Sequence, residues 1–358
     1  MSQTVNRILK HHLYIEFSLK SGKLSLDFIK NISILFFTLI FPLSIQAQTD
    51  HYPPDPYWQG TLGPLNIRSL SPGQALRLAP LPRSPYGLPE GRTEIQFNIG
   101  AASIFLQSPG RYLIDFNFID SRIAINHGFS NGWSTELSFN DRRIQNLYLD
   151  EMVESFHDAF GIDQNGRDIN QNQTRVIIPQ YSANFAGELE GVFSQTLGLS
   201  IQKVLIDKTV EWPAVAITLN TSLETLSDGM IEKGAFDYGL QFSLAQKKSS
   251  GYFYANASYT RFGSDKTLQT IPLSKSQLSG MLGYEFSIKE NQALIVQYLF
   301  SEGVMKNLGA LDKISHEIHL GYKWRTEKNI YEAGLVENII NFDNGPDVAF
   351  TFGITHRL

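Results

Sequence analysis

The sequence predicts an all-β fold: a closed antiparallel transmembrane β-barrel of about 12 strands (range about 10–14), with one short helix in a long loop. Three observations predict it. Apolar side chains recur at every second position in segments of about ten residues, aromatic residues stand at the ends of these segments, and the connections alternate between short and long. A soluble β-sandwich shares only the first of these features, because its apolar faces pack inward rather than against lipid.

Composition excludes several classes of function. The chain has 358 residues, of which 42% are hydrophobic and 12% aromatic, and it contains no cysteine. Disulfides, thiolate metal sites and cysteine nucleophiles are therefore excluded. The formal net charge of −5 becomes −8 if residues 1–47 are removed, because they carry five basic and two acidic residues. This charge and the lack of a basic patch predict no nucleic-acid partner.

Residues 1–47 have the features of an export signal. Lys30 precedes an apolar run from Ile32 to Ile45, which is short for a membrane span, and Ala47 stands at a cleavage-type position. We expect Sec-type export with cleavage near Ala47; the alternative is an uncleaved membrane anchor. The acidic Glu16 and Asp27 are unusual before such a run, and they predict that translation starts later than the first methionine.

Residues 48–92 form a segment rich in proline and glycine. This composition excludes a regular helix or a central strand. The segment is expected to be extended, and it either lies in the periplasm, disordered or folded, or plugs the barrel that follows it.

From Thr93 onward the pattern has a period of two residues, and residues 93–358 are predicted to form the barrel. Its clearest example is the apolar series Ile318, Leu320, Tyr322 and Trp324, which alternates with Glu317, His319, Gly321 and Lys323. Strands are predicted at 94–105, 111–128, 133–141, 196–206, 212–221, 235–246, 251–262, 279–288, 292–301, 314–324, 330–340 and 347–357. The stretch 173–195 is a possible further hairpin.

The second strand has an irregularity. Its apolar parity changes between Phe118 and Ile123, which predicts a β-bulge.

The ends of the strands and their connections favour a barrel. Trp133, Trp212 and Trp324 stand where an interfacial aromatic girdle would lie. The connections 207–209, 247–250, 289–291 and 325–329 are short, whereas 222–234, 263–275, 302–313 and 341–347 are long. A barrel must close, because an open sheet edge would leave backbone groups unpaired in hydrocarbon.

One segment has helical spacing instead. Leu149, Met152, Val153, Phe156 and Phe160 recur as on one helix face, and Gly161 is a helix stop. This helix is expected in a long extracellular insertion, about 142–195, which either packs on itself or folds inward and narrows the lumen. The candidate functional residues of this insertion are Phe156, His157, Phe160 and Arg167.

Three stretches resemble a known family. "GPLNIRSLSPGQALRLAPLP" (63–82), "FHDAFGIDQNGRD" (156–168) and "ENIINFDNGPDVAFTFGI" (337–354) resemble the domain of unknown function family 3187, from about Gly63 to the end. The resemblance implies a Gram-negative outer-membrane barrel and brings no activity, substrate or catalytic residue. The chain departs from the usual barrel ending by closing on "THRL" rather than on phenylalanine.

Strand parity selects the candidate lumen residues. Nine polar side chains are expected to face inward: Asp115, Glu136, Asp237, Glu285, Glu317, His319, Lys323, Glu332 and Arg357. Acidic groups outnumber basic ones, which indicates either a salt-bridged closed interior or a mildly cation-preferring passage.

The function predicted from these features is an envelope-structural barrel or a narrow passage for small solutes. The alternatives are a barrel-embedded lipid-modifying hydrolase and a plugged transporter of apolar compounds. The sequence contains no G-x-S-x-G, H-E-x-x-H or P-loop motif, so an enzyme is disfavoured, and no catalytic residue, metal site or cofactor is predicted.

The expected location is the outer membrane of a Gram-negative bacterium. The expected partners are outer-membrane lipid and, during biogenesis, barrel-assembly machinery and periplasmic chaperones. The last strand is expected to pair with the first, and Phe350, Phe352, Ile354 and Leu358 are the predicted assembly signal. The sequence does not indicate an oligomeric state.

Overall fold

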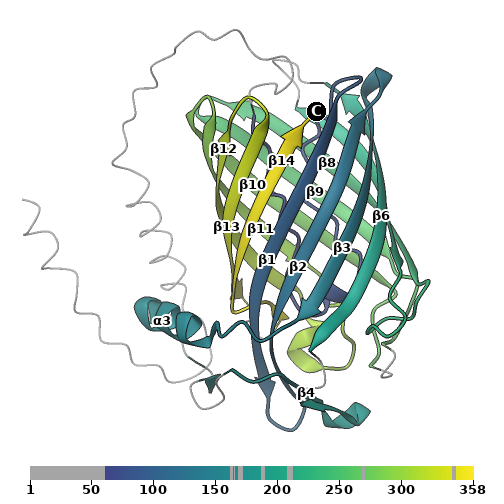
Figure 1. Ribbon diagram of the computed structural model, residues 1–358, viewed down its shortest axis with the longest axis vertical. Coiled ribbons are helices and arrows are strands. Elements are labelled where there is room, and N and C mark those ends of the chain that lie inside the picture. Colours follow the sequence, from purple (N-terminus) through teal and green to yellow (C-terminus); the bar gives the residue numbers. More distant parts are fainter. Residues whose placement is uncertain are drawn as a thin grey trace, which may run out of the picture. The chain divides into compact units, whose positions relative to one another are not determined.

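The computed structural model describes residues 61–161, 164, 166–167, 172–186, 190–207, 213–267, 271–340 and 344–358 (Figure 1). The predicted signal peptide, residues 48–60 and Trp212 lie outside the described residues. No helix in the described ranges is both long and apolar enough to cross a bilayer.

Twelve long antiparallel strands of the described chain form a closed barrel. They are β1 (Thr93–Ser108), β2 (Tyr112–Gly128), β3 (Trp133–Ile144), β6 (Gly191–Ile206), β7 (Ala214–Glu224), β8 (Phe236–Lys248), β9 (Gly251–Arg261), β10 (Ser276–Lys289), β11 (Gln292–Ser301), β12 (Ser315–Arg325), β13 (Asn329–Ile340) and β14 (Val348–Arg357). Each strand pairs with its neighbours in this order. The barrel closes where β14 pairs with β1, from Glu94↔Arg357 to Ser103↔Val348. The predicted closed barrel of about 12 strands is confirmed.

The two ends of the barrel differ. At the turn end, strands meet through short connections such as residues 249–250 between β8 and β9, and β14 also ends there (Figure 1). At the loop end, longer connections such as residues 262–275 and 302–314 join the strands. In outer-membrane barrels the short turns are periplasmic and the long loops extracellular.

The outer surface of the wall is apolar. In β8, Phe236 and Phe242 are about half exposed, whereas the alternating Asp237 and Ser243 are buried and face inward. Trp133 and Trp324 also lie on the outer face, at the turn ends of their strands. This alternation is the pattern of a wall that meets lipid outside and polar groups inside.

The loop end carries a hairpin and a helix that are not wall strands. β4 (Arg175–Ile178) and β5 (Ala183–Ala186) form a hairpin that pairs with β2 over Leu113–Asp115. The predicted hairpin is therefore present, but it adds to the end of β2 instead of widening the barrel. Helix α3 (Asp150–Phe160) ends at Gly161, whose φ of 66° is the left-handed conformation that glycine favours. Figure 1 shows α3 and β4 at the end of the barrel opposite the C-terminus.

The bulge predicted in the second strand is wrong. β2 pairs with β1 in unbroken register from Thr93↔His127 to Ser108↔Tyr112. The apolar parity changes for another reason: Phe116 and Phe118 face inward and are buried near the loop end, whereas Ile123 and Ile125 face outward and are about half exposed. The strand stays regular, and the environment of its two faces changes along its length.

Candidate functional site: a lumen filled by residues 61–92

Residues 61–92, called here the lumenal segment, run inside the barrel as a hairpin. Its ascending arm (61–70) starts beside Glu285, its tip (71–77) contacts Val304 and Met305 of a loop-end connection, and its descending arm (78–92) returns to the turn end. There Gly91 donates to the carbonyl of Gly128, and β1 begins. The many prolines explain why the segment joins no strand ladder, since proline has no N–H to contribute.

Glu285 holds the start of the ascending arm. Its carboxylate accepts hydrogen bonds from the N–H groups of Leu62 and Gly63, both at 3.0 Å, and from the Thr61 hydroxyl at 2.7 Å. The Tyr254 hydroxyl donates to the same carboxylate at 2.7 Å. A buried irregular backbone needs acceptors that a sheet would otherwise supply, and this wall carboxylate provides them.

Further wall side chains hold the rest of the ascending arm. The Asn66 N–H donates to Glu332 at 3.1 Å, and the Ser69 hydroxyl donates to Glu317 at 2.5 Å. Lys323 lies beside Glu332, at 3.0 Å, and donates to the Pro64 carbonyl at 2.6 Å. The wall thus satisfies both the donors and the acceptors of the arm.

Three arginines of the lumenal segment pair with wall carboxylates. Arg68 Nε donates to Asp120 at 2.8 Å, a guanidinium nitrogen of Arg83 lies 2.6 Å from Glu136, and one of Arg77 lies 3.9 Å from Asp237. Two arginines of the wall contact the same acids: Arg142 pairs with Asp120, and Arg122 pairs with Glu136.

Arg77 is the most deeply buried of the three segment arginines. Burial lowers its pKa from the ordinary value, and the Asp237 carboxylate opposes the shift. Arginine stays charged under such shifts, so the lumenal segment brings three positive charges into the bore.

Glycines in the wall make room for the ascending arm. A Cβ atom at Gly321 would lie 2.5 Å from Leu65 Cδ2, and one at Gly334 would lie 2.7 Å from Ile67 Cδ1. A Cβ atom at Gly100 would lie 3.5 Å from the nearest atom of Leu70, which is an ordinary contact distance. The wall is therefore shaped around a separate segment, and its own side chains do not fill the bore at these positions.

The fit at Gly334 gives a prediction. Gly334→Leu is expected to displace the ascending arm and to raise the rate of trypsin cleavage after Arg68 about tenfold, because overpacking costs about 1–3 kcal/mol. Adding Ile67→Ala should restore most of the protection, and Gly100→Ala should leave the rate unchanged. Mass spectrometry of the cleaved N-terminus measures the rate; equal rates in all variants would contradict the packing described here.

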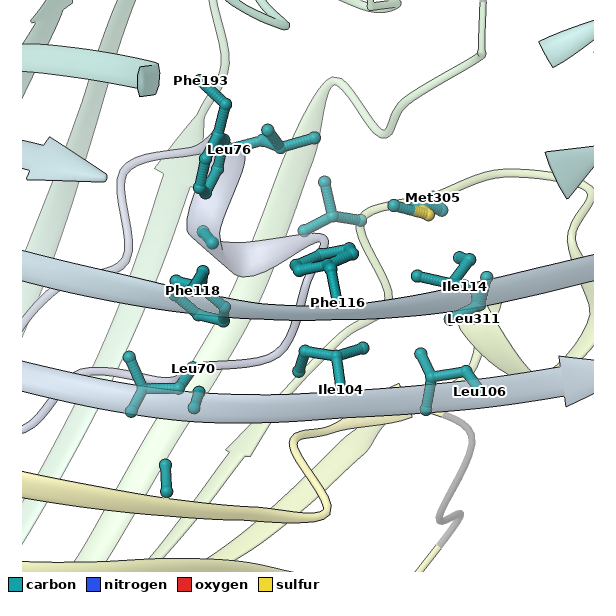
Figure 2. Packing of buried hydrophobic residues seen from close by; sticks show 14 of the residues in the cluster. Leu70, Leu76, Ile104, Leu106, Ile114, Phe116, Phe118, Phe193, Met305 and Leu311 are labelled. Atoms are coloured by element: carbon teal, nitrogen blue, oxygen red, sulfur yellow. The ribbon is translucent and has the colours of Figure 1, made fainter. Parts of the chain in front are cut away.

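An apolar cluster closes the loop end. Leu70 and Leu76 of the lumenal segment lie among inward-facing side chains of β1 and β2 and residues of the loops (Figure 2). The labelled wall and loop members are Ile104, Leu106, Ile114, Phe116, Phe118, Phe193, Met305 and Leu311. The tip and the end of the ascending arm are therefore anchored by burial of apolar surface, in addition to the polar contacts that hold the segment.

The turn end is less tightly filled. A cavity of about 150 Å³ lies between the start of the ascending arm and the descending arm. Its lining includes Asn66 and Arg83 from the two arms and Glu94, Glu136 and Lys323 from the wall. The two arms are thus separated by a polar space at the end where the segment enters.

An ion cluster on the outer face joins two of the three stretches that carry the family resemblance, 156–168 and 337–354. Arg167 bonds to both Asp150 and Asp347, and it also donates to the Ser103 hydroxyl at 2.9 Å. Its guanidinium carbon lies 5.1 Å from the ring centre of Phe105. Ser103 and Phe105 are on the outward face of β1, so this part of the insertion contacts the outside of the wall.

Burial affects Asp347, the acid that the stretch 337–354 contributes to this cluster. It raises the pKa of Asp347 to about 6, and the Arg167 guanidinium works against that shift. Among the other candidates of the insertion, His157 is buried, Phe156 is half-buried beside it, and the Phe160 side chain lies outside the described residues.

The structure places eight of the nine predicted lumen residues on inward faces, where they are buried. These are Glu136, Asp237, Glu285, Glu317, His319, Lys323, Glu332 and Arg357. Asp115 is different: it shares a face of β2 with Ile123 and Ile125, so it points outward, 4.0 Å from Arg175. The expectation for Asp115 is wrong because the inward face of β2 is apolar at this height.

Sequence reasoning did not select Arg68, Arg77 and Arg83. A local signal for them exists, since residues 61–88 contain these three arginines and neither an acid nor a lysine. Gly321 and Gly334 were also not selected, because glycine in a strand pattern does not show what approaches it.

The fold and the filled lumen define a β-barrel of the outer-membrane type whose bore holds the lumenal segment of the same chain. The chain belongs to the family described as "Protein of unknown function (DUF3187)", whose model matches residues 41–358. No curated protein matches the chain.

Solved structures of similar fold include an outer membrane channel from Pseudomonas putida F1, at 10% identity and a TM-score of 0.49, covering 77% of this chain and 99% of that one. The NanC porin is similar at 11% identity and a TM-score of 0.42, over 74% of this chain and 100% of that one. The translocator domain of the autotransporter NalP from Neisseria meningitidis is similar at 10% identity and a TM-score of 0.40, over 75% and 89%.

Proposed function

We propose that the protein is an outer-membrane passage for small solutes that its own lumenal segment holds closed. In this proposal the chain is exported, loses its signal near Ala47 and inserts with its turn end in the periplasm. The observation that carries the proposal is the separable filling of the bore: the segment contacts the wall from one end of the barrel to the other, and it belongs to no strand ladder.

The way the segment is held supports a gate more than a permanent core. Both arms are fixed by hydrogen bonds to side chains such as Glu285, Glu332 and Asn256, which water can replace when the arm leaves. The strands, in contrast, are held by continuous backbone ladders. The segment can therefore loosen while the barrel remains folded.

The wall glycines support the same proposal. A barrel of about twelve strands has an intermediate bore, between barrels filled by their own side chains and open porins. Here Gly321 and Gly334 leave space that Leu65 and Ile67 of the segment occupy. Removal of the segment would leave that space to water.

Deletion of residues 61–88 tests the proposal. The shortened chain keeps Gly91, whose bond to Gly128 anchors the entry to β1. In planar bilayers it is expected to give steps at least about tenfold larger than the full chain, because the bore is then filled by water. Heat-dependent gel mobility checks that the barrel has folded. A folded deletion variant that conducts no better than the full chain would favour an envelope-structural barrel instead.

A further inference from the structure

The inner wall of the barrel is acidic. Among the described residues, eight buried carboxyl groups face inward, against four buried bases. The acids are Glu94, Asp120, Glu136, Glu224, Asp237, Glu285, Glu317 and Glu332, and the bases are Arg122, Arg142, Lys323 and Arg357. With all of them charged, the wall carries an excess of four negative charges.

The lumenal segment carries the opposite charge. Residues 61–88 contain Arg68, Arg77 and Arg83 and no acid or lysine. Each of these arginines pairs with a different wall carboxylate, on β2, β8 and β3. The backbone N–H groups of the ascending arm donate to two more, Glu285 and Glu332. The closed barrel is thus nearly neutral inside because the segment supplies the missing positive charge.

The wall carboxylates differ in the partners that remain beside them when the segment leaves. Asp120 and Glu136 keep Arg142 and Arg122, which belong to the wall itself. Among the described wall residues, Asp237, Glu285, Glu317 and Glu332, called here the acidic stripe, have only two basic partners: Lys323, which lies 3.0 Å from Glu332, and His319, which lies 3.1 Å from Glu317. Their other described partners outside the lumenal segment are neutral donors, such as the Tyr254 hydroxyl on Glu285 and the Gly263 N–H on Asp237. The uncompensated negative charge of an emptied bore is therefore concentrated on β8, β10, β12 and β13.

We propose that the opened passage selects small cations, inorganic or organic, and that the arginines and N–H groups of the lumenal segment occupy the cation-binding surface while it is closed. This inference rests on the proposed function and names its solute class. Carboxylates that line a narrow bore with low-dielectric walls raise the local concentration of cations and exclude anions. The segment acts as a tethered substitute for the solute, since it offers the same kind of donors to the same carboxylates.

The test uses the barrel that lacks residues 61–88, in planar bilayers under a potassium chloride gradient. The reversal potential is expected to give a ratio of potassium to chloride permeability of roughly five or more, because the wall has excess carboxylate charge. Glu285→Gln combined with Glu332→Gln should bring this ratio down, towards one. The matched control is Glu290→Gln, in the exposed turn between β10 and β11, which should leave the ratio unchanged.

A second measurement extends the test to organic solutes. Liposomes that contain the same deletion variant are expected to take up arginine several times faster than glutamate, which is of comparable size but opposite charge. Conductance without cation preference, or equal uptake of the two amino acids, would overturn this inference and leave the passage intact. A folded variant with no conductance would overturn the proposed function itself, and this inference with it.

Discussion

Replacing Glu285 with alanine is expected to release the start of the lumenal segment and to speed trypsin cleavage after Arg68, Arg77 and Arg83 roughly a hundredfold. The substitution leaves the buried N–H groups of Leu62 and Gly63 and the Thr61 hydroxyl without their acceptor. Each lost partner costs about 1–3 kcal/mol, and a total of about 3 kcal/mol corresponds to the expected change in the open population. Digestion of the folded protein in detergent, followed by mass spectrometry of the new N-termini, measures it.

Two variants make this result specific. Glu285→Gln keeps one acceptor oxygen and should give an intermediate rate, whereas Glu290→Ala, in the exposed turn between β10 and β11, should behave as the unmodified chain. All variants must show the heat-dependent mobility of a folded barrel. Identical cleavage rates for Glu285→Ala and the unmodified chain would mean that this carboxylate does not hold the segment in place.

A disulfide between the tip of the lumenal segment and a loop-end connection is expected to reverse the release that Glu285→Ala causes. A Cβ atom at Gly73 would lie 3.3 Å from Val304 Cβ, close to the separation of about 3.5–4.5 Å that a disulfide needs. Gly73 has a φ of −68°, so a cysteine there meets no backbone strain. The chain has no other cysteine, so the pair Gly73→Cys and Val304→Cys forms without competing thiols.

The expected effect is large because of where the tether lies. In the Glu285→Ala background, the oxidised pair should lower cleavage after Arg77 at least about tenfold, since Arg77 is four residues from the bond and cannot be withdrawn through the bore. Reduction should restore the fast rate. Each cysteine alone is the control, and it should show no dependence on reductant. Fast cleavage after Arg77 with the disulfide intact would contradict the position assigned to the tip.

The strands of this fold were largely predictable from the sequence, because lipid outside and polar groups inside impose a two-residue alternation. β8 shows it directly: Phe236 and Phe242 face outward, and Asp237 faces inward. The rule failed for Asp115 and Phe116 because the loop-end part of the lumen holds an apolar cluster, so apolar no longer means outward there. The local sign of that change is the switch of apolar parity between Phe118 and Ile123, which predicted a bulge that the regular register of β2 excludes.

The site was predictable only in part. Parity selected Glu285 and Glu332 as inward-facing acids, but their partners lie more than 200 positions earlier in the sequence. Proline excluded a strand over residues 61–88, but the sequence left open whether this segment lies in the periplasm or plugs the barrel. Two of the stretches that carry the resemblance contain Arg167 and Asp347, and only the folded chain brings these two residues, 180 positions apart, into contact.

Residues 61–92 occupy the bore, and we propose that the bore would conduct ions without them. The most direct test is the conductance of the Gly73→Cys, Val304→Cys protein in one planar bilayer as urea is raised, before and after addition of reductant. Urea should loosen the irregular segment before the barrel ladders, because the segment buries less surface and is held by fewer backbone bonds. We expect no conductance from the oxidised protein and, after reduction, steps of the size given by the chain without residues 61–88. Steps of that size while the disulfide is intact, or none after reduction up to the unfolding of the barrel, would contradict a bore closed by the lumenal segment.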